Sequence, residues 1–248
     1  MNPFINIHTH QSHIDNKEFI EIYNIDVDSN VNVDVTFLYS IGIHPWDCQK
    51  SKVKSSIVQW LNGSTVQWLN GSIVQWLNSS TVQWLNGSTV QWLNGSTAIG
   101  ECGIDRACGI DFDIQKDVFI KQIEISEQYN KPMIIHAVRA HSDIISIRKE
   151  TKAKMSWIIH GFQGNEQIVN QYLRHNIYLS LGDVLFKNES RAVELLKTIP
   201  SERLFLETDD SERSIVDVYE RASVLSGRSL DDLRSDIFNN FVKIFGKI

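Results

Sequence analysis

Two histidines separated by one residue follow the first apolar run of the chain, residues 4–7. Because side chains alternate along a β-strand, His8 and His10 point to one side of the strand and Thr9 points to the other. Two imidazoles that converge in this way suit a divalent metal ion. A polar strand end explains the pair equally well, so the pair alone does not decide between the two interpretations.

The same arrangement recurs at the ends of four further apolar runs. Glu101 ends Ala-Ile-Gly-Glu, His136 ends Met-Ile-Ile-His, and His160 ends Trp-Ile-Ile-His. Asp209 closes Leu-Phe-Leu-Glu-Thr-Asp. Four neutral imidazoles and two carboxylates are a suitable ligand set for two divalent ions, and Glu101 is the carboxylate that could bridge them. We therefore expect a metal site built from His8, His10, Glu101, His136, His160 and Asp209.

Ligands from five strands can meet only where the carboxyl ends of those strands lie together. Eight short apolar runs, alternating with helical patterns in the later part of the chain, predict an α/β fold with a parallel sheet, most simply a (β/α)₈ TIM barrel. In such a barrel the active site lies at the C-terminal ends of the strands. Few residues separate the first three runs, so we expect a shortened N-terminal half and a distorted barrel. The predicted strands are 4–7, 20–25, 37–43, 98–101, 133–136, 157–160, 177–181 and 204–207, and the predicted helices include 113–129, 191–198, 215–226 and 230–245.

Six motifs of the chain resemble those of the TatD family. They are Ile-His-Thr-His, Ser-Ile-Gly-Ile-His-Pro-Trp, Ala-Ile-Gly-Glu-Cys-Gly-Ile-Asp, Ile-Ile-His-Ala-Val-Arg, Ile-Ile-His-Gly-Phe-Gln-Gly and Leu-Glu-Thr-Asp. They occur in the order of the family and cover nearly the whole chain outside a run of repeats. The resemblance implies a distorted barrel of the metal-dependent hydrolase type with a two-metal centre. It also implies a hydrolase, with deoxyribonuclease as the activity most often attached to the family.

The resemblance implies a role for each matching residue. His8, His10 and Asp209 would hold the first ion, Glu101 would bridge to the second, and His136 and His160 would complete the second. The ions would activate a bridging water for attack on a phosphodiester. Asp209 is then either the general base for that water or purely a ligand.

Three further residues belong to the same motifs. His44 follows a strand and precedes a proline that fixes the loop. Arg139 comes three residues after His136 and could offer a bidentate fork to phosphate. We expect both to bind substrate, although either could instead brace its loop. Asp105 is expected to support the ligands from behind.

Five near-copies of one octad, Val-Gln-Trp-Leu-Asn-Gly-Ser-Thr, begin at residues 58, 66, 74, 82 and 90. Asn-Gly between apolar stretches favours a meander of short strands, whereas a supported long helix is the alternative. We expect a single domain, 1–248, with the octads as an insertion at 58–97. Because the insertion ends just before a strand begins, we expect it opposite the active face. Self-association through the exposed tryptophans of the octads is a further possibility.

Composition excludes several classes of protein. The chain has 24 Lys and Arg against 30 Asp and Glu, a net charge of −6, which argues against a protein that coats nucleic acid. Three cysteines without paired spacing make neither a disulfide framework nor a zinc finger. No apolar run is long enough to span a membrane, and the first residues do not read as a signal peptide. We therefore expect a cytoplasmic protein.

Three functions remain open at this point. The first is a two-metal phosphodiesterase acting on DNA ends, with Zn²⁺, Mg²⁺ or Mn²⁺ as cofactor. The second is hydrolysis of a small ester, amide or aminoacyl bond, since the ions do not select the electrophile. The third is an interaction protein in which the tryptophan-bearing octads bind a partner.

Overall fold

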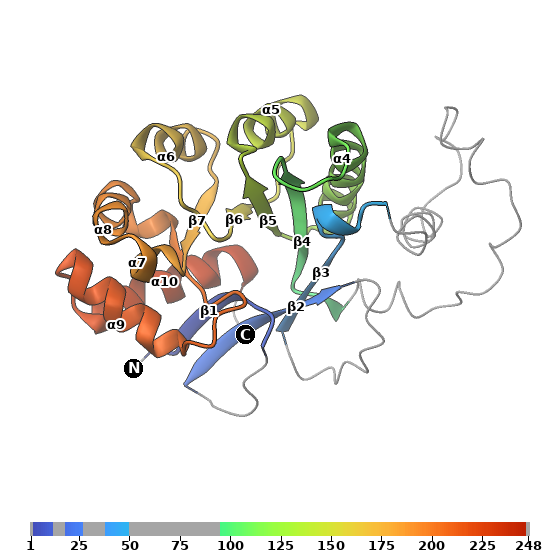
Figure 1. Cartoon of the computed structure of the whole chain (residues 1–248). Helices are drawn as coiled ribbons and strands as arrows, with labels where there is room; N and C mark the ends of the chain where they lie inside the picture. The colour runs from blue at the N-terminus through green and yellow to red at the C-terminus, as the bar shows by residue number, and fades with distance from the viewer. Residues whose placement is uncertain (1, 12–17, 27–37, 50–94, 247–248) are drawn as a thin grey trace, which may run out of the picture.

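Eight parallel β-strands follow one another in chain order around a single sheet (Figure 1). The computed structural model describes residues 2–11, 18–26, 38–49 and 95–246. Each strand pairs in parallel with the next, from β1 to β8. The strands are β1 (Phe4–Thr9), β2 (Phe19–Asp26), β3 (Leu38–Gly42), β4 (Ala98–Asp105), β5 (Met133–Val138), β6 (Trp157–Ile159), β7 (Tyr178–Leu181) and β8 (Leu204–Leu206).

The first strand and the segment after the last strand meet and nearly close the sheet into a barrel. Thr9 and Asp209 form a parallel β-bridge. The amide of His10 donates to the carbonyl of Asp209 at 3.3 Å, and the amide of Asp209 donates to the carbonyl of His8 at 3.1 Å. This seam confirms the predicted (β/α)₈ architecture, and it places three of the predicted metal ligands at the point of closure.

Helices alternate with strands from β4 onward and lie outside the barrel (Figure 1). Their ends follow ordinary capping chemistry. The Asp111 side chain accepts from two amides at the start of α4, Ser214 and Asp217 form a capping box on α9, and Gly227 ends α9 with φ 71°. The helices are α4 (Phe112–Tyr129), α5 (His141–Thr151), α6 (Glu166–Leu173), α7 (Val184–Lys187), α8 (Glu189–Thr198), α9 (Ile215–Ser226) and α10 (Leu230–Phe245), with 3₁₀ turns η1 (Pro45–Asp47) and η2 (Ser201–Arg203).

Two buried glutamines of α4 hold the ends of β3 and β4. The Gln122 side chain accepts from the amide of Ile43 at 2.7 Å and donates to the carbonyl of the same residue at 3.1 Å. The Gln115 side chain does the same for Asp105, at 2.8 and 3.1 Å. The two glutamines are seven residues apart, so they share one face of the helix. They fix the backbone from which His44 and Asp105 extend.

The strand and helix predictions agree well with the structure. All eight predicted strands are present, and the four predicted helices correspond to α4, α8, α9 and α10. The near-continuous apolar runs are buried, as parallel strands covered on both faces require. The connections that follow β1 and β2 lie mostly outside the described residues, so the predicted shortening of this half stays a prediction.

The octads lie outside the described residues, except for the last three residues of the predicted insertion, 95–97. The Thr97 amide donates to the Tyr39 carbonyl at 2.7 Å, and the Lys131 ammonium donates to the Ser96 carbonyl. This end of the insertion therefore joins the barrel where β4 begins, opposite the catalytic end of the strands. None of the helices in the described segments combines the length and apolar character that a membrane span needs.

Candidate metal centre

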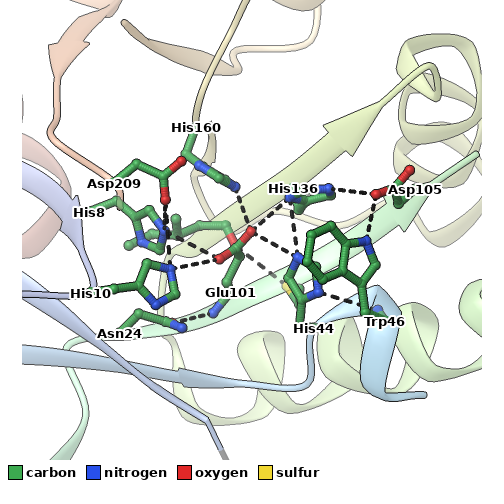
Figure 2. A network of polar contacts seen from close by, with 12 residues as sticks. His8, His10, Asn24, His44, Trp46, Glu101, Asp105, His136, His160 and Asp209 are labelled. Atoms are coloured by element: carbon green, nitrogen blue, oxygen red, sulfur yellow. Dashed lines mark hydrogen bonds and ion pairs between the residues drawn. The ribbon is translucent and has the colours of Figure 1, made fainter. Parts of the chain in front are cut away.

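Glu101 is the hub of a cluster of imidazoles at the C-terminal end of the barrel (Figure 2). One carboxylate oxygen, Oε2, lies 3.3 Å from Nε2 of His8 and 3.3 Å from Nε2 of His10. Both rings therefore face the same side, as strand alternation predicts. Glu101 is 4% exposed, so its charge is held in the interior.

The other oxygen of Glu101, Oε1, faces a second set of rings (Figure 2). It lies 2.7 Å from Nδ1 of His136 and 2.7 Å from Nε2 of His160. His44 joins this set, with its Nε2 3.2 Å from Oε1 and 3.3 Å from Nδ1 of His136. Each oxygen of one carboxylate thus has its own group of imidazoles.

Asp209 completes the first group. Its Oδ1 lies 3.6 Å from Nε2 of His8 and 3.7 Å from Nε2 of His10. The residue has φ 54°, a left-handed conformation that Asp tolerates better than most residues. Its side chain is 39% exposed, so it is the carboxylate of the cluster that reaches solvent.

Two carboxylates orient the rings from behind. Oδ2 of Asp105 lies 3.3 Å from Nε2 of His136, which leaves Nδ1 of that ring to face Glu101. Oε1 of Glu207 lies 3.7 Å from Nδ1 of His160, which leaves Nε2 facing Glu101. Outer carboxylates of this kind set the tautomer and orientation of histidines that bind metals. The predicted supporting position of Asp105 agrees with this geometry.

Glu101 is held in position by two residues, Asn24 and Gly103, that were not predicted from the sequence. The Asn24 side chain on β2 accepts from the backbone amide of Glu101 at 2.6 Å and from the Ser40 hydroxyl at 3.1 Å. Gly103 has φ 141°, and a Cβ at this position would lie 2.1 Å from the carbonyl oxygen of His136. Only glycine allows β4 and β5 to approach so closely beside the cluster.

The structure brings seven of the eight predicted site residues together and leaves one outside. The cluster around Glu101 includes His44, which we expected to contact substrate and which the geometry also makes a possible metal ligand. Arg139 follows β5 with an exposed side chain and φ 51°. Within the described residues it makes no hydrogen bond or ion pair, so its guanidinium is available to a ligand.

A comparison with protein-family models matches residues 27–246 to the family described as TatD related DNase. The chain belongs to the TatD family. Among curated TatD relatives, an uncharacterized metal-dependent hydrolase of Bacillus subtilis, YabD, is 41% identical over 45% of each chain. YcfH of Escherichia coli K12, which carries the same description, is 28% identical over 60% of this chain and 62% of its own length. The deoxyribonuclease Tat-D of Schizosaccharomyces pombe is 27% identical over 45% of this chain.

Solved structures of the TatD family share the fold of this chain. YjjV, a TatD homologue from Escherichia coli K12, superposes with a TM-score of 0.68 over 99% of this chain and 98% of its own, at 16% identity. A TatD-family hydrolase from Entamoeba histolytica superposes with a TM-score of 0.67. At these identities the likeness establishes the barrel. The chain spans less than two thirds of the length of the curated relatives YabD and YcfH.

The cluster of this TatD-family chain fits divalent ions. Two ligands that share a tetrahedral ion at about 2.0–2.2 Å lie about 3.4 Å from one another. The separations of 3.3–3.7 Å among His8, His10, Glu101 and Asp209 are close to this value, whereas His136 and His160 lie nearer to Glu101, at 2.7 Å. Both ring nitrogens of His8 and Nδ1 of His160 are buried without a hydrogen bond within the described residues. Because an unpaired buried polar atom is costly, the fold calls for a group that these rings can bind.

The charges of the cluster are strongly coupled. Burial acts to raise the pKa of Glu101, but the charge of His160 and the hydrogen bonds from His10 and His136 hold it well below its usual range. Burial and His160 act to lower the pKa of His8, but the carboxylates of Asp209 and Glu101 outweigh them and raise it to about 9. Burial acts to raise the pKa of Asp209, but the nearby His8 and His160 outweigh this effect and lower the pKa to about 2. Without metal, the cluster therefore holds protons that an ion must displace.

Metal binding by this TatD-family chain should release protons and strengthen with pH. Since the His8 pKa is raised from 6.5 to about 9, this ring is protonated in the folded metal-free protein at pH 7.5. We expect the affinity for Zn²⁺ to rise about tenfold per pH unit for each proton displaced, up to about pH 9. The raised pKa of His8 also stabilises the folded state of the metal-free protein. This contribution has its full value below pH 6.5 and is lost as the pH rises through 9.

Calorimetric titration in two buffers of different ionisation enthalpy measures the protons released. Thermal unfolding with chelator present follows the stability of the metal-free chain over the same pH range. The variant His175→Asn, which changes a histidine outside the cluster, should show the same slope as the unaltered protein. An affinity that stays constant between pH 6.5 and 9 contradicts the coupling.

Proposed function

We propose that this chain is a two-metal phosphodiesterase that hydrolyses DNA, acting at its ends. The observation that carries the proposal is the division of the cluster by the two oxygens of Glu101. His8, His10 and Asp209 would hold one ion, and His136 and His160 would hold the other, with Glu101 between them. This assignment follows the predicted ligand set and the rings that face each oxygen of Glu101. A ring nitrogen of His160 also lies within 4.8 Å of one of His8.

The hydrolytic chemistry depends on divalent ions. Bound at these residues, they would supply a water of lowered pKa and would neutralise the negative charge of a phosphate. Metal-dependent hydrolase is also the description of the bacterial relatives YabD and YcfH, and deoxyribonuclease that of the fission-yeast relative. Zn²⁺, Mg²⁺ and Mn²⁺ are all compatible with histidine and carboxylate ligands.

Asp209 is the residue that would move the proton. It is the more exposed of the two carboxylates in the predicted ligand set, 39% against 4% for Glu101. It can therefore contact a water that enters from solvent and accept its proton as the bond from the water oxygen to phosphorus forms. The ester bond from phosphorus to the leaving sugar oxygen breaks in the same displacement, and that oxygen takes up a proton from solvent. Its neighbours His8 and His10 keep this carboxylate oriented toward the centre of the cluster.

His44 and Arg139 would hold the phosphate. His44 lies inside the cluster, with its Nδ1 accepting from the Trp46 amide at 3.2 Å, so Nε2 is the nitrogen that faces Glu101. Arg139 is the residue directly after β5 and comes three residues after His136. A planar guanidinium binds two phosphate oxygens at once. Because the chain has a net charge of −6, a local cation of this kind is needed to bind an anionic substrate.

A parallel assay on two substrate classes tests the proposal. The chain is loaded with Zn²⁺, Mn²⁺ or Mg²⁺ in turn and incubated with single-stranded DNA and with a panel of carboxylic esters and amides. We expect DNA hydrolysis that chelation abolishes and that added metal restores. Turnover of an ester or amide without turnover of DNA would assign the centre to a small-molecule hydrolase instead.

A further inference from the structure

Trp46 is exposed and yet held in place. Its side chain is 60% exposed, and it is the aromatic member of the four large exposed apolar side chains among the described residues. The indole Nε1 donates to Oδ2 of Asp105 at 2.7 Å (Figure 2). Pro45 precedes Trp46 in η1, and the backbone amide of Trp46 donates to Nδ1 of His44. A single exposed apolar side chain is ordinary, but this one is held by a hydrogen bond of its indole, on a residue whose backbone amide is also bonded, so it has lost conformational freedom.

The indole lies directly beside the metal-facing rings. Its centroid is 4.8 Å from that of His44 and 6.3 Å from that of His136 (Figure 2). The interplanar angles are 85° and 73°. Within the described residues no ring is stacked parallel to the indole, so an incoming planar group can stack there. Such a group would sit next to any phosphate bound in the cluster.

The surroundings of Trp46 suit a nucleotide. Asp105, which binds the indole, pairs in strand register with Val138, a second exposed apolar residue. Arg139 follows Val138, and its guanidinium makes no hydrogen bond or ion pair with any residue of the described segments. Proteins that bind single nucleic-acid strands combine aromatic side chains, on which bases stack, with cations that contact the backbone.

We propose that Trp46 is a stacking platform that binds a nucleobase adjacent to the scissile phosphate. This inference rests on the proposed phosphodiesterase function and adds a residue that recognises the substrate outside the metal cluster. The role is one of positioning, since the base that stacks on Trp46 fixes the sugar and thereby the phosphate. Sequence-independent stacking of this kind would accept any of the four bases, because each has a π-face.

The test separates stacking from the hydrogen bond to Asp105. The variants Trp46→Phe and Trp46→Leu both lose the indole N–H, so any effect through Asp105 and His136 is common to the two. They differ in the aromatic face. Two substrates are compared with the metal-loaded variants, a thymidine tetranucleotide and the same backbone with every base removed. Metal content and thermal unfolding of both variants should match, because the side chain is largely exposed.

Stacking is expected to appear as a base-dependent difference between the two variants. A base–aromatic contact of about 1–3 kcal/mol corresponds to roughly 5- to 150-fold. We therefore expect kcat/KM on the thymidine tetranucleotide to be lower for Trp46→Leu than for Trp46→Phe by a factor in this range. On the abasic backbone the two variants should agree within about twofold. Equal values for the two variants on the thymidine substrate would overturn the proposal.

A binding measurement keeps the inference separate from the proposed function. If the unaltered chain hydrolyses neither substrate, the phosphodiesterase assignment is wrong, and calorimetric titration with the two tetranucleotides then decides the role of Trp46. Tighter binding of the thymidine form that is retained by Trp46→Phe and lost by Trp46→Leu supports the platform. Equal binding of the thymidine and abasic forms by the unaltered chain refutes it.

Discussion

Glu101→Gln is expected to abolish binding of two ions and to reduce the rate of hydrolysis by more than about a hundredfold. This reduction exceeds the roughly 10- to 100-fold loss that follows removal of a residue that only supports a metal ligand. The substitution keeps the size of the side chain but removes its negative charge. It also turns an amide NH₂ toward one group of imidazoles, where an acceptor is needed. The rings that surround the carboxylate are His8, His10, His44, His136 and His160.

Elemental analysis of metal per chain, together with the rate on single-stranded DNA, measures both effects. Glu124→Gln is the matched control, because this glutamate lies on the outer surface of α4 and pairs only with Lys121 among the contacts described. The control should retain the metal content and rate of the unaltered protein. Retention of two ions by Glu101→Gln would show that this carboxylate does not bridge them.

Asp209→Asn is expected to lower kcat by about 10² to 10⁴, the contribution typical of a general base. Asparagine, like aspartate, tolerates the left-handed conformation that this residue adopts at φ 54°, so the barrel seam should form normally. Asp209 lies 3.6 and 3.7 Å from His8 and His10, and its ligand oxygen is also within 4.8 Å of a ring nitrogen of His160. Because Glu101, His136 and His160 are unchanged in this variant, we expect the ion assigned to those residues to remain.

Rate and metal content together separate the two roles of Asp209. Loss of one ion per chain identifies it as a ligand, whereas full metal content with a reduced rate identifies it as the base. Asp210→Asn, at the exposed neighbouring residue, is the control and should leave both quantities unchanged. A rate within threefold of the unaltered protein for Asp209→Asn would remove this residue from the mechanism.

The fold and most of the cluster could be predicted because both follow from simple periodic patterns. Parallel strands covered on both faces appear as short apolar runs, and each ligand marks the residue at which a run stops. The central position of Glu101 among the imidazoles followed from its chemistry as the carboxylate that could bridge two ions. The pairing of His8 and His10 on one side followed from strand alternation, which the structure reproduces.

Single polar residues that act through the backbone could not be found in this way. Asn24 and Gln122 each lie within an otherwise unremarkable strand or helix, and their importance depends on a partner far along the chain. Glu207 resembles any polar strand end until the fold places it behind His160. Trp46 lies next to a motif histidine, but only the structure shows that its ring is both exposed and hydrogen-bonded.

The seam between β1 and the segment after β8 has a consequence for how the protein matures. The Thr9 hydroxyl bonds to Thr208, a contact that spans 199 residues of sequence, and His8, His10 and Asp209 flank it. During synthesis the N-terminal histidines emerge first, and almost the entire chain must follow before Asp209, the second of their acidic partners, is made. Contacts of such long sequence separation form late in folding. On the proposed assignment, acquisition of the first ion would mark a completely folded molecule, and a chain cut short before residue 209 would lack one of the residues proposed to hold that ion.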